Sequence, residues 1–166
     1  MNRRKDRILR PQLSFKDIRM KKAENFFSAE EKEAVIDAIK AAEHNTSGEI
    51  RVHLEDTCPE DVLDRAAYIF EKLQMHKTKQ RNGVLFYLSV QDRKFAILGD
   101  AGIHAVTPEN FWEGIKKNMS EYFSRGDFIT GLIKGIDLTS EVLKNDYPYQ
   151  KNDVDELPNE ISFGEN

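Results

Sequence analysis

Residues that could bind a divalent cation stand where predicted strands begin or end. Glu49 begins one predicted strand, Asn82 precedes a second, and Asp100 follows a third. With the first two strands parallel and the third antiparallel to the second, all three positions meet at one edge of the sheet. Carboxylate, amide and hydroxyl oxygens are the ligands that Ca²⁺ and Mg²⁺ prefer. Further polar residues are predicted at the same edge: His44, Asn45, Thr46 and His104.

The opposite edge of the sheet collects a second polar group, made of Asp56, Thr57, Asp92 and Asp127. Ligands of open α/β sheets usually bind beyond the carboxyl ends of parallel strands, which favours this edge. Members of both groups also suit backbone roles as turn residues or helix caps, so a purely structural reading stays open at each edge. The candidate metal ligands are Glu49, Asn82, Asp100 and Asp127. We expect Ca²⁺ as the ion, with Mg²⁺ as the alternative.

Other common chemistries have no matching pattern in the sequence. The four histidines do not have HExxH spacing, and the sequence contains no Walker A, GxGxxG or GxSxG motif. Cys58 is the single cysteine, which excludes an intrachain disulfide and a cysteine-cluster zinc site. It stands at a predicted helix N-terminus without a histidine partner nearby in sequence, and we interpret it as a packing or capping residue.

Four helices and three strands are predicted to position these residues. Ser28-Ala29-Glu30-Glu31 is a capping box that starts the first helix, and Thr57-Cys58-Pro59-Glu60 resembles a second one. Apolar residues at helical spacing then predict helices at about 28–44, 59–76, 108–123 and 128–144. Asp127 is predicted to cap the last of them. The predicted strands span about 49–56, 84–90 and 95–98.

The strand patterns predict the fold class. Residues 84–90 are almost continuously apolar, which is typical of a strand covered on both faces. Residues 49–56 alternate between apolar and polar, which favours a position near the sheet edge. A right-handed crossover makes the first two strands parallel, and the short turn at Gln91-Asp92 makes the last two antiparallel. We therefore predict an α/β fold, a three-layer α/β/α sandwich around a small mixed β-sheet.

Charge divides the chain into three parts. Residues 1–22 hold nine Lys or Arg against two Asp, a charge of +7, so with −4 for all 166 residues the remainder carries −11. We predict a basic N-terminal arm at 1–25, one domain at 26–145, and an acidic C-terminal tail at 146–166 that is disordered or loosely docked. An acidic domain does not favour nucleic acid. No apolar run reaches the ~20 residues of a membrane span and no signal peptide is visible, so we expect a cytoplasmic protein that could meet a membrane only through its arm.

Several short motifs resemble the TPM domain family. They are Phe27-Ser28-x-x-Glu31, the run TSGEIRV at 46–52, Asn-Gly-Val-Leu at 82–85, Asp-Arg-Lys-x-x-Ile at 92–97, Gly-x-x-Gly at 99–102, and Gly-Asp-x-x-x-Gly-Leu at 126–132. The resemblance implies an α/β/α sandwich that holds calcium or another divalent ion in an acidic groove. In one plant branch of the family it also implies a weak acid phosphatase activity. At residues 99–104 this sequence departs from the Gly-Tyr-Gly-Leu-Glu that is common in the family.

Two functions follow as hypotheses. The first is a TPM-like calcium-binding domain that works as a non-enzymatic binding or adaptor module for a protein partner that the sequence does not identify. The second is a metal-assisted, phosphatase-like hydrolase in which Asp100 or Asp127 acts as nucleophile or base. Against the second, the available arginines do not stand in a phosphate-cradling loop; these are Arg51, Arg81 and Arg93.

Overall fold

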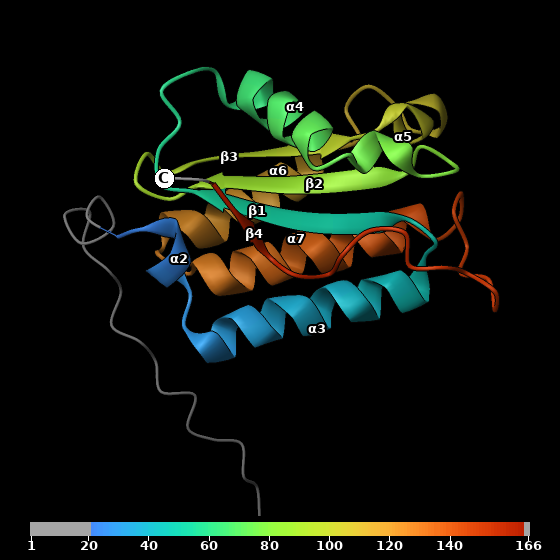
Figure 1. Ribbon diagram of the computed structural model, residues 1–166, viewed down its shortest axis with the longest axis horizontal. Coiled ribbons are helices and arrows are strands. Elements are labelled where there is room, and N and C mark those ends of the chain that lie inside the picture. The colour runs from blue at the N-terminus through green and yellow to red at the C-terminus, as the bar shows by residue number, and fades with distance from the viewer. Residues whose placement is uncertain (1–20, 165–166) are drawn as a thin grey trace, which may run out of the picture.

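The computed structural model describes residues 21–164, and within them the chain folds into three layers. A four-stranded sheet lies in the middle, with helices on both faces (Figure 1). This confirms the predicted mixed α/β sandwich. The basic arm, apart from residues 21–25, lies outside the described residues. Within 21–164, none of the helices has the length and apolar character needed to span a membrane.

The sheet has the strand order β3-β2-β1-β4. Strand β1 (Glu49–Glu55) pairs in parallel with β2 (Gly83–Ser89) along seven residues, and β2 pairs antiparallel with β3 (Lys94–Gly99). On its other side β1 pairs in parallel with the two-residue strand β4 (Ser162–Phe163). The amino ends of β1 and β2 therefore lie side by side, with the end of β3 next to them.

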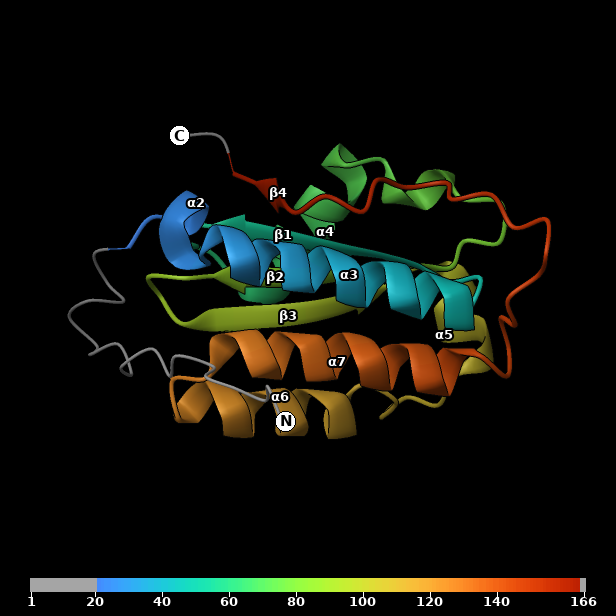
Figure 2. The same ribbon diagram turned by 90° about the horizontal axis from the view of Figure 1, so that it is seen from below.

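Three long helices cover one face of the sheet (Figure 2). They are α3 (Ala29–Asn45), α6 (Glu113–Ser124) and α7 (Phe128–Leu143), and the short α2 (Ala23–Phe26) precedes them. Alternate residues of the strands point into this layer, among them Ile50, Val52 and Phe86, which are fully buried. Burial of this apolar surface is the main stabilising term for the domain.

Helix α4 (Val62–Lys72) covers the opposite face and is followed by the short 3₁₀ helix η1 (Met75–Lys77). The other set of alternating side chains packs under it, including Leu85 and Tyr87 of β2. Strand β2 is thus buried on both faces, as its continuous apolar run predicts.

Two of the predicted helix starts, those of α3 and α7, have the caps that the sequence predicts. Ser28 and Glu31 form the predicted capping box, and Asp127 caps α7 by accepting the Thr130 N–H. The second predicted box is wrong: Asp61, not Thr57, caps α4 through the Leu63 and Asp64 N–H groups. Residues 57–60 are not helical, since the Cys58 N–H donates to Asp92 and its carbonyl accepts the Lys94 ammonium, and the helix begins after Asp61.

Two further differences concern the segment between β3 and α7. A short helix, α5 (Ala101–Val106), follows β3 directly and was not predicted. Asp100 caps it through the Ala101 N–H. The predicted helix at 108–123 begins only at Glu113, because residues 107–112 form turns.

The C-terminal segment, which the sequence predicts to be disordered or loosely docked, lies against the domain. Residues 145–164 run along β1 and end in β4 (Figures 1 and 2). Tyr147 and Leu157 are each only 8% exposed. Strand β1 is consequently flanked on both sides, and its polar residues Glu49, His53 and Glu55 are buried rather than facing solvent at an edge.

Candidate metal centre

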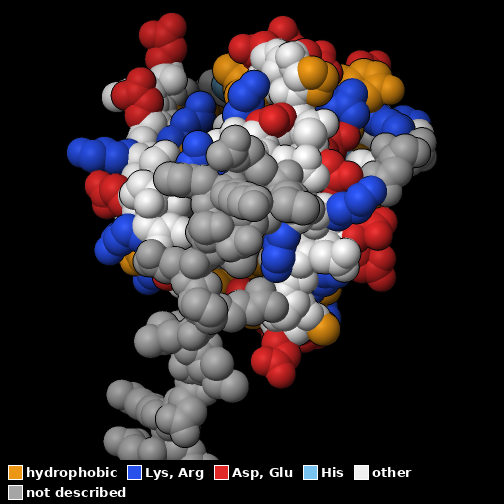
Figure 3. All heavy atoms as spheres, turned by 90° about the vertical axis from the view of Figure 1, so that its left-hand side faces the viewer, with side chains coloured by type: hydrophobic (Ala, Val, Ile, Leu, Met, Phe, Trp, Pro, Cys, Tyr) orange, Lys and Arg blue, Asp and Glu red, His pale blue; other side chains and the backbone are white. Residues whose placement is uncertain are grey.

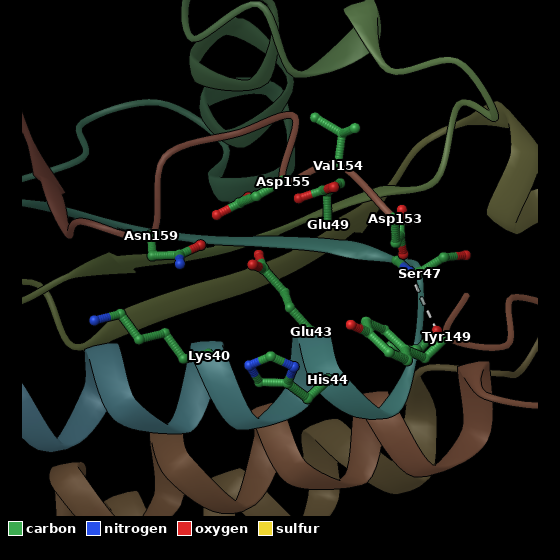
Figure 4. A pocket seen from close by; sticks show the side chains of 12 residues that line it. Lys40, Glu43, His44, Ser47, Glu49, Tyr149, Asp153, Val154, Asp155 and Asn159 are labelled. Carbon is green, nitrogen blue, oxygen red and sulfur yellow. Dashed lines mark hydrogen bonds between the residues drawn. The ribbon is translucent and has the colours of Figure 1, made fainter. Parts of the chain in front are cut away.

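Three carboxylates from separate parts of the chain converge beside the amino end of β1. Glu43 lies in the last turn of α3, Glu49 is the first residue of β1, and Asp155 belongs to the C-terminal segment. One oxygen from each lies within 4.8 Å of the other two. Figure 4 shows Glu43 extending from α3 toward Glu49 and Asp155. We call these three residues the carboxylate cluster.

The loop between α3 and β1 fixes the first two carboxylates. The Thr46 hydroxyl donates a 2.5 Å hydrogen bond to the Tyr147 carbonyl and accepts the Gly48 N–H. The Ser47 N–H also donates to the Tyr147 carbonyl, at 2.8 Å. The helix therefore turns into the strand within three residues, and the start of the C-terminal segment is tied to the same loop.

Two oxygens of the cluster are buried without a hydrogen-bond donor. Glu49 is 3% exposed; its Oε1 accepts the Glu156 N–H at 3.1 Å, and its Oε2 has no partner within residues 21–164. The Oε1 atom of Glu43 is likewise buried and unpartnered among the described residues. A carboxylate offers only acceptors, so carboxylates in contact repel each other unless a proton or a cation lies between them.

Burial and, after it, this repulsion raise the pKa values of Glu43 and Glu49. Burial, followed by the charges of Glu49 and Asp155, raises the pKa of Glu43 from 4.5 to about 9. Burial is also the main cause that raises the pKa of Glu49 to about 7, with Asp155 adding to it, although the Glu156 backbone N–H works in the opposite direction. Without a cation, the cluster therefore retains protons at neutral pH.

The cluster opens into a cavity of about 140 Å³. Asp155 is exposed on its outer side, whereas Glu49 forms its floor. Asn159 supplies another buried oxygen, Oδ1, that has no partner in the described part of the chain. Further lining residues come from α3 and from the C-terminal segment (Figure 4): Lys40, His44, Tyr149, Asp153 and Val154.

The structure places the four predicted ligands in different surroundings. Glu49 belongs to the carboxylate cluster. Asn82 lies next to it, where its Nδ2 donates to the Ser47 carbonyl and its backbone carbonyl accepts the Glu49 N–H. Asp100 is paired with Arg81 through two hydrogen bonds of 2.7 and 2.8 Å.

Asp127 lies at the other end of the molecule. It caps the N-terminus of α7, and the last residue of this 16-residue helix, Leu143, lies against Gly48. At 1.5 Å per residue the helix separates Asp127 from the loop at Gly48 by about 24 Å. Asp127 and Glu49 therefore cannot bind the same ion.

The other polar residues predicted at this edge of the sheet also lie in different surroundings. His44 and Thr46 line the cavity, Asn45 donates to Ser140 and Glu141 on α7, and His104 is exposed on α5.

At the opposite edge, acidic side chains have structural partners. Asp56 accepts the Ala23 N–H, and Asp92 accepts the Ser89 hydroxyl and the Cys58 N–H. Basic and acidic side chains are interspersed over this end of the molecule (Figure 3).

Sequence reasoning missed Glu43 and Asp155. The signal for Asp155 is the acidic run at 153–156, which is followed by the apolar residues Leu157, Ile161 and Phe163. Such apolar residues indicate a segment that packs on the domain. Glu43 has a weaker signal, since an acidic residue in the last turn of a helix opposes the helix dipole and so suggests another role.

The fold and the site together define a three-layer α/β/α domain with an acidic cavity beside the amino end of its central strands. The sequence model of the TPM domain matches residues 20–142, and the chain belongs to this family. The comparison with curated proteins gave no match.

Solved structures share the fold. The chain is similar to the BA42 protein of the psychrophilic bacterium Bizionia argentinensis, with 48% identity and a TM-score of 0.82 over 87% of this chain and all of that one. It also resembles in fold the N-terminal domain of a protein from P. gingivalis (18% identity, TM-score 0.63, 74% of this chain and 80% of that one). A third similar fold is the N-terminal domain of the cg2496 protein of Corynebacterium glutamicum (15%, TM-score 0.53, 72% and 75%).

Proposed function

We propose that this TPM domain is a calcium-binding module, and that Glu43, Glu49 and Asp155 hold the ion. The observation that carries the proposal is the buried, unpartnered Oε2 of Glu49, which lies within a cluster of three carboxylate groups. A buried acceptor without a donor is unfavourable by about 1–3 kcal/mol, and more when it is charged. A cation at this point would satisfy the oxygens and remove the repulsion among the three groups.

The donor set fits Ca²⁺ better than Mg²⁺. Ca²⁺ accepts six to eight oxygens in irregular arrangements, whereas Mg²⁺ requires a near-ideal octahedron. The cluster draws its oxygens from a helix end, a strand start and a loop, and the exposed side at Asp155 leaves room for water. Asn159 Oδ1 is available as a neutral ligand of the same hard type.

The test is calorimetric titration of metal-stripped protein with Ca²⁺ and, separately, with Mg²⁺. We expect a single Ca²⁺ site that is lost or weakened at least tenfold in Glu49→Gln and in Asp155→Asn, since each removes one charged ligand. Glu33→Gln is the matched control, because Glu33 is exposed on α3 and lies outside the cavity. Ca²⁺ binding that is equal in all four proteins would reject the assignment of ligands. The absence of any binding up to millimolar concentrations would reject the module itself.

The alternative function is a metal-assisted phosphatase. Lys40 and His44 on the rim of the cavity are the groups that favour it, because they could offset phosphate charge beside a bound ion. Asp100 and Asp127, the acids first considered as nucleophile or base, are paired with Arg81 and engaged as a helix cap. Turnover of p-nitrophenyl phosphate that requires Ca²⁺ or Mg²⁺ and disappears in Glu49→Gln would favour the enzyme. Calcium binding without turnover would favour the module.

A further inference from the structure

We propose that residues 150–164, the C-terminal strap, close over β1 only when the metal centre is filled, so that the cation controls access to the edge of β1. The proposal rests on the cation-binding function proposed above. It concerns a different part of the molecule from the ligands themselves, namely the segment that follows Asp155 and the strand that this segment covers.

The chain just before the strap is attached to the domain without any need for an ion. Tyr147 donates its hydroxyl to the Gly102 carbonyl at 2.6 Å, and its carbonyl accepts two donors from the loop at residues 46–47. Residues 149–156 after it are exposed. The chain therefore has a fixed point at Tyr147 and an exposed stretch from which the rest of the strap could swing away.

The middle of the strap is held at the metal centre. Asp155 belongs to the carboxylate cluster, and the next residue, Glu156, donates its N–H to Glu49 Oε1. The Asp155 carboxylate lies close to those of Glu43 and Glu49 here. A cation bound here would link Asp155 of the strap to Glu43 and Glu49 of the domain, and its removal would take that link away.

Beyond this point the strap is held by three apolar side chains and a short strand pair. Leu157 packs in the apolar cluster under α4, and Ile161 and Phe163 pack against the larger core on the other face. Ser162 contacts His53 Nδ1 at 2.7 Å, and β4 pairs with only two residues of β1. By comparison, β1 pairs with β2 over seven residues. A two-residue ladder is a weak attachment, because short strand pairs are marginal in water. The docked state of the strap can therefore be shifted by the free energy of ion binding.

Opening would uncover the outer edge of β1. The strap lies over this edge, where the Leu54 carbonyl accepts the Gly164 N–H. A released edge presents free backbone donors and acceptors. Buried polar groups of the same strand, Arg51 and His53, would become accessible at the same time.

Hydrogen exchange with mass spectrometric readout on the full chain tests the coupling. In peptides that cover residues 49–55 and 153–164, amide exchange should slow on addition of Ca²⁺ to stripped protein. The change can reach about 100-fold at 100 times the dissociation constant, if the ion binds only the closed form. Asp155→Asn should abolish the change, whereas Asp146→Asn, an exposed acid of the same tail outside the cavity, should retain it.

A reciprocal experiment separates coupling from a merely local site. Leu157→Ala weakens the strap at a residue outside the cavity, and coupling should lower Ca²⁺ affinity by a factor within the range of about 5- to 150-fold that is typical of linked sites. Leu63→Ala, the same substitution at a 47% exposed position on α4, should leave affinity unchanged. Ca²⁺ binding with no change in strap exchange, or with full affinity in Leu157→Ala, would overturn the strap proposal and leave the metal site standing. If wild type does not bind Ca²⁺, both proposals fail.

Discussion

The pH dependence of calcium binding follows directly from the raised pKa values of the carboxylate cluster. In the metal-free protein Glu43 has a pKa of about 9 and Glu49 one of about 7. At pH 7 Glu43 is therefore protonated and Glu49 is about half protonated. Since the ion binds the deprotonated groups, its binding at pH 7 should release ~1.5 protons, about one of them from Glu43.

The released protons set the size of the effect on affinity. Each released proton changes the apparent dissociation constant by about tenfold per pH unit. The affinity for Ca²⁺ should thus rise by more than about tenfold from pH 6 to pH 7, by about tenfold or slightly more from pH 7 to pH 8, and level off above about pH 9. A tenfold change corresponds to about 1.4 kcal/mol.

Glu43→Gln tests the reasoning, because glutamine keeps the shape of the side chain but does not titrate. Calorimetry in buffers of different ionisation enthalpy gives the number of protons released. This number should fall by about one in Glu43→Gln at pH 7 and remain unchanged in Glu33→Gln, which alters an exposed residue of the same helix. An affinity that does not vary between pH 6 and pH 9, or equal proton release in wild type and Glu43→Gln, would refute the assignment.

Three other predictions concern stability. His53 has a pKa lowered to about 4, chiefly by burial, so the unfolded state takes up a proton first as the pH falls from 6.5 to 4. Denaturant unfolding should show a loss of up to ~3 kcal/mol over this range in wild type but not in His53→Asn, and parallel curves would contradict it. Asp127→Ala should lower the free energy of unfolding by about 0.5–2 kcal/mol, because the cap of α7 is lost. Calorimetry should show unchanged Ca²⁺ affinity in this variant, and a weaker affinity would contradict the separation of Asp127 from the metal centre. Gly102→Ala should lower the melting temperature by several degrees, because the added Cβ would lie 2.2 Å from the Gln80 carbonyl oxygen. A melting temperature equal to that of wild type would show that the loop at Gln80 shifts to make room.

The features that sequence reasoning predicted correctly depend on neighbouring residues. The capping box at Ser28, the cap at Asp127 and the hairpin of β2 and β3 each arise within a few positions of the chain. The burial of β2 on both faces is also local information, because a continuous apolar strand is stable only when both faces are covered. These patterns were sufficient for the fold class.

The start of α4 and the existence of α5 needed more than local pattern. The capping-box pattern at Thr57 predicts an earlier start for α4, but the cap in the structure is Asp61. Asp100 could be read as a metal ligand or as a turn residue from its sequence, but Arg81 lies close enough in the fold to bind both of its oxygens. Which of several suitable roles a polar residue takes depends on the partner that tertiary packing brings to it.

The composition of the metal centre was decided by tertiary structure alone. The sequence by itself determined a mixed α/β sandwich with Glu49 at the start of its first strand. It did not determine that this strand would be covered by a segment from the end of the chain, where Glu156 donates to Glu49 from 107 positions away. Apolar residues of the strap pack against the domain and carry Asp155 toward Glu43 and Glu49. The burial of those few side chains, a property of the folded surface and not of any local pattern, is what makes three separate carboxylates into one site.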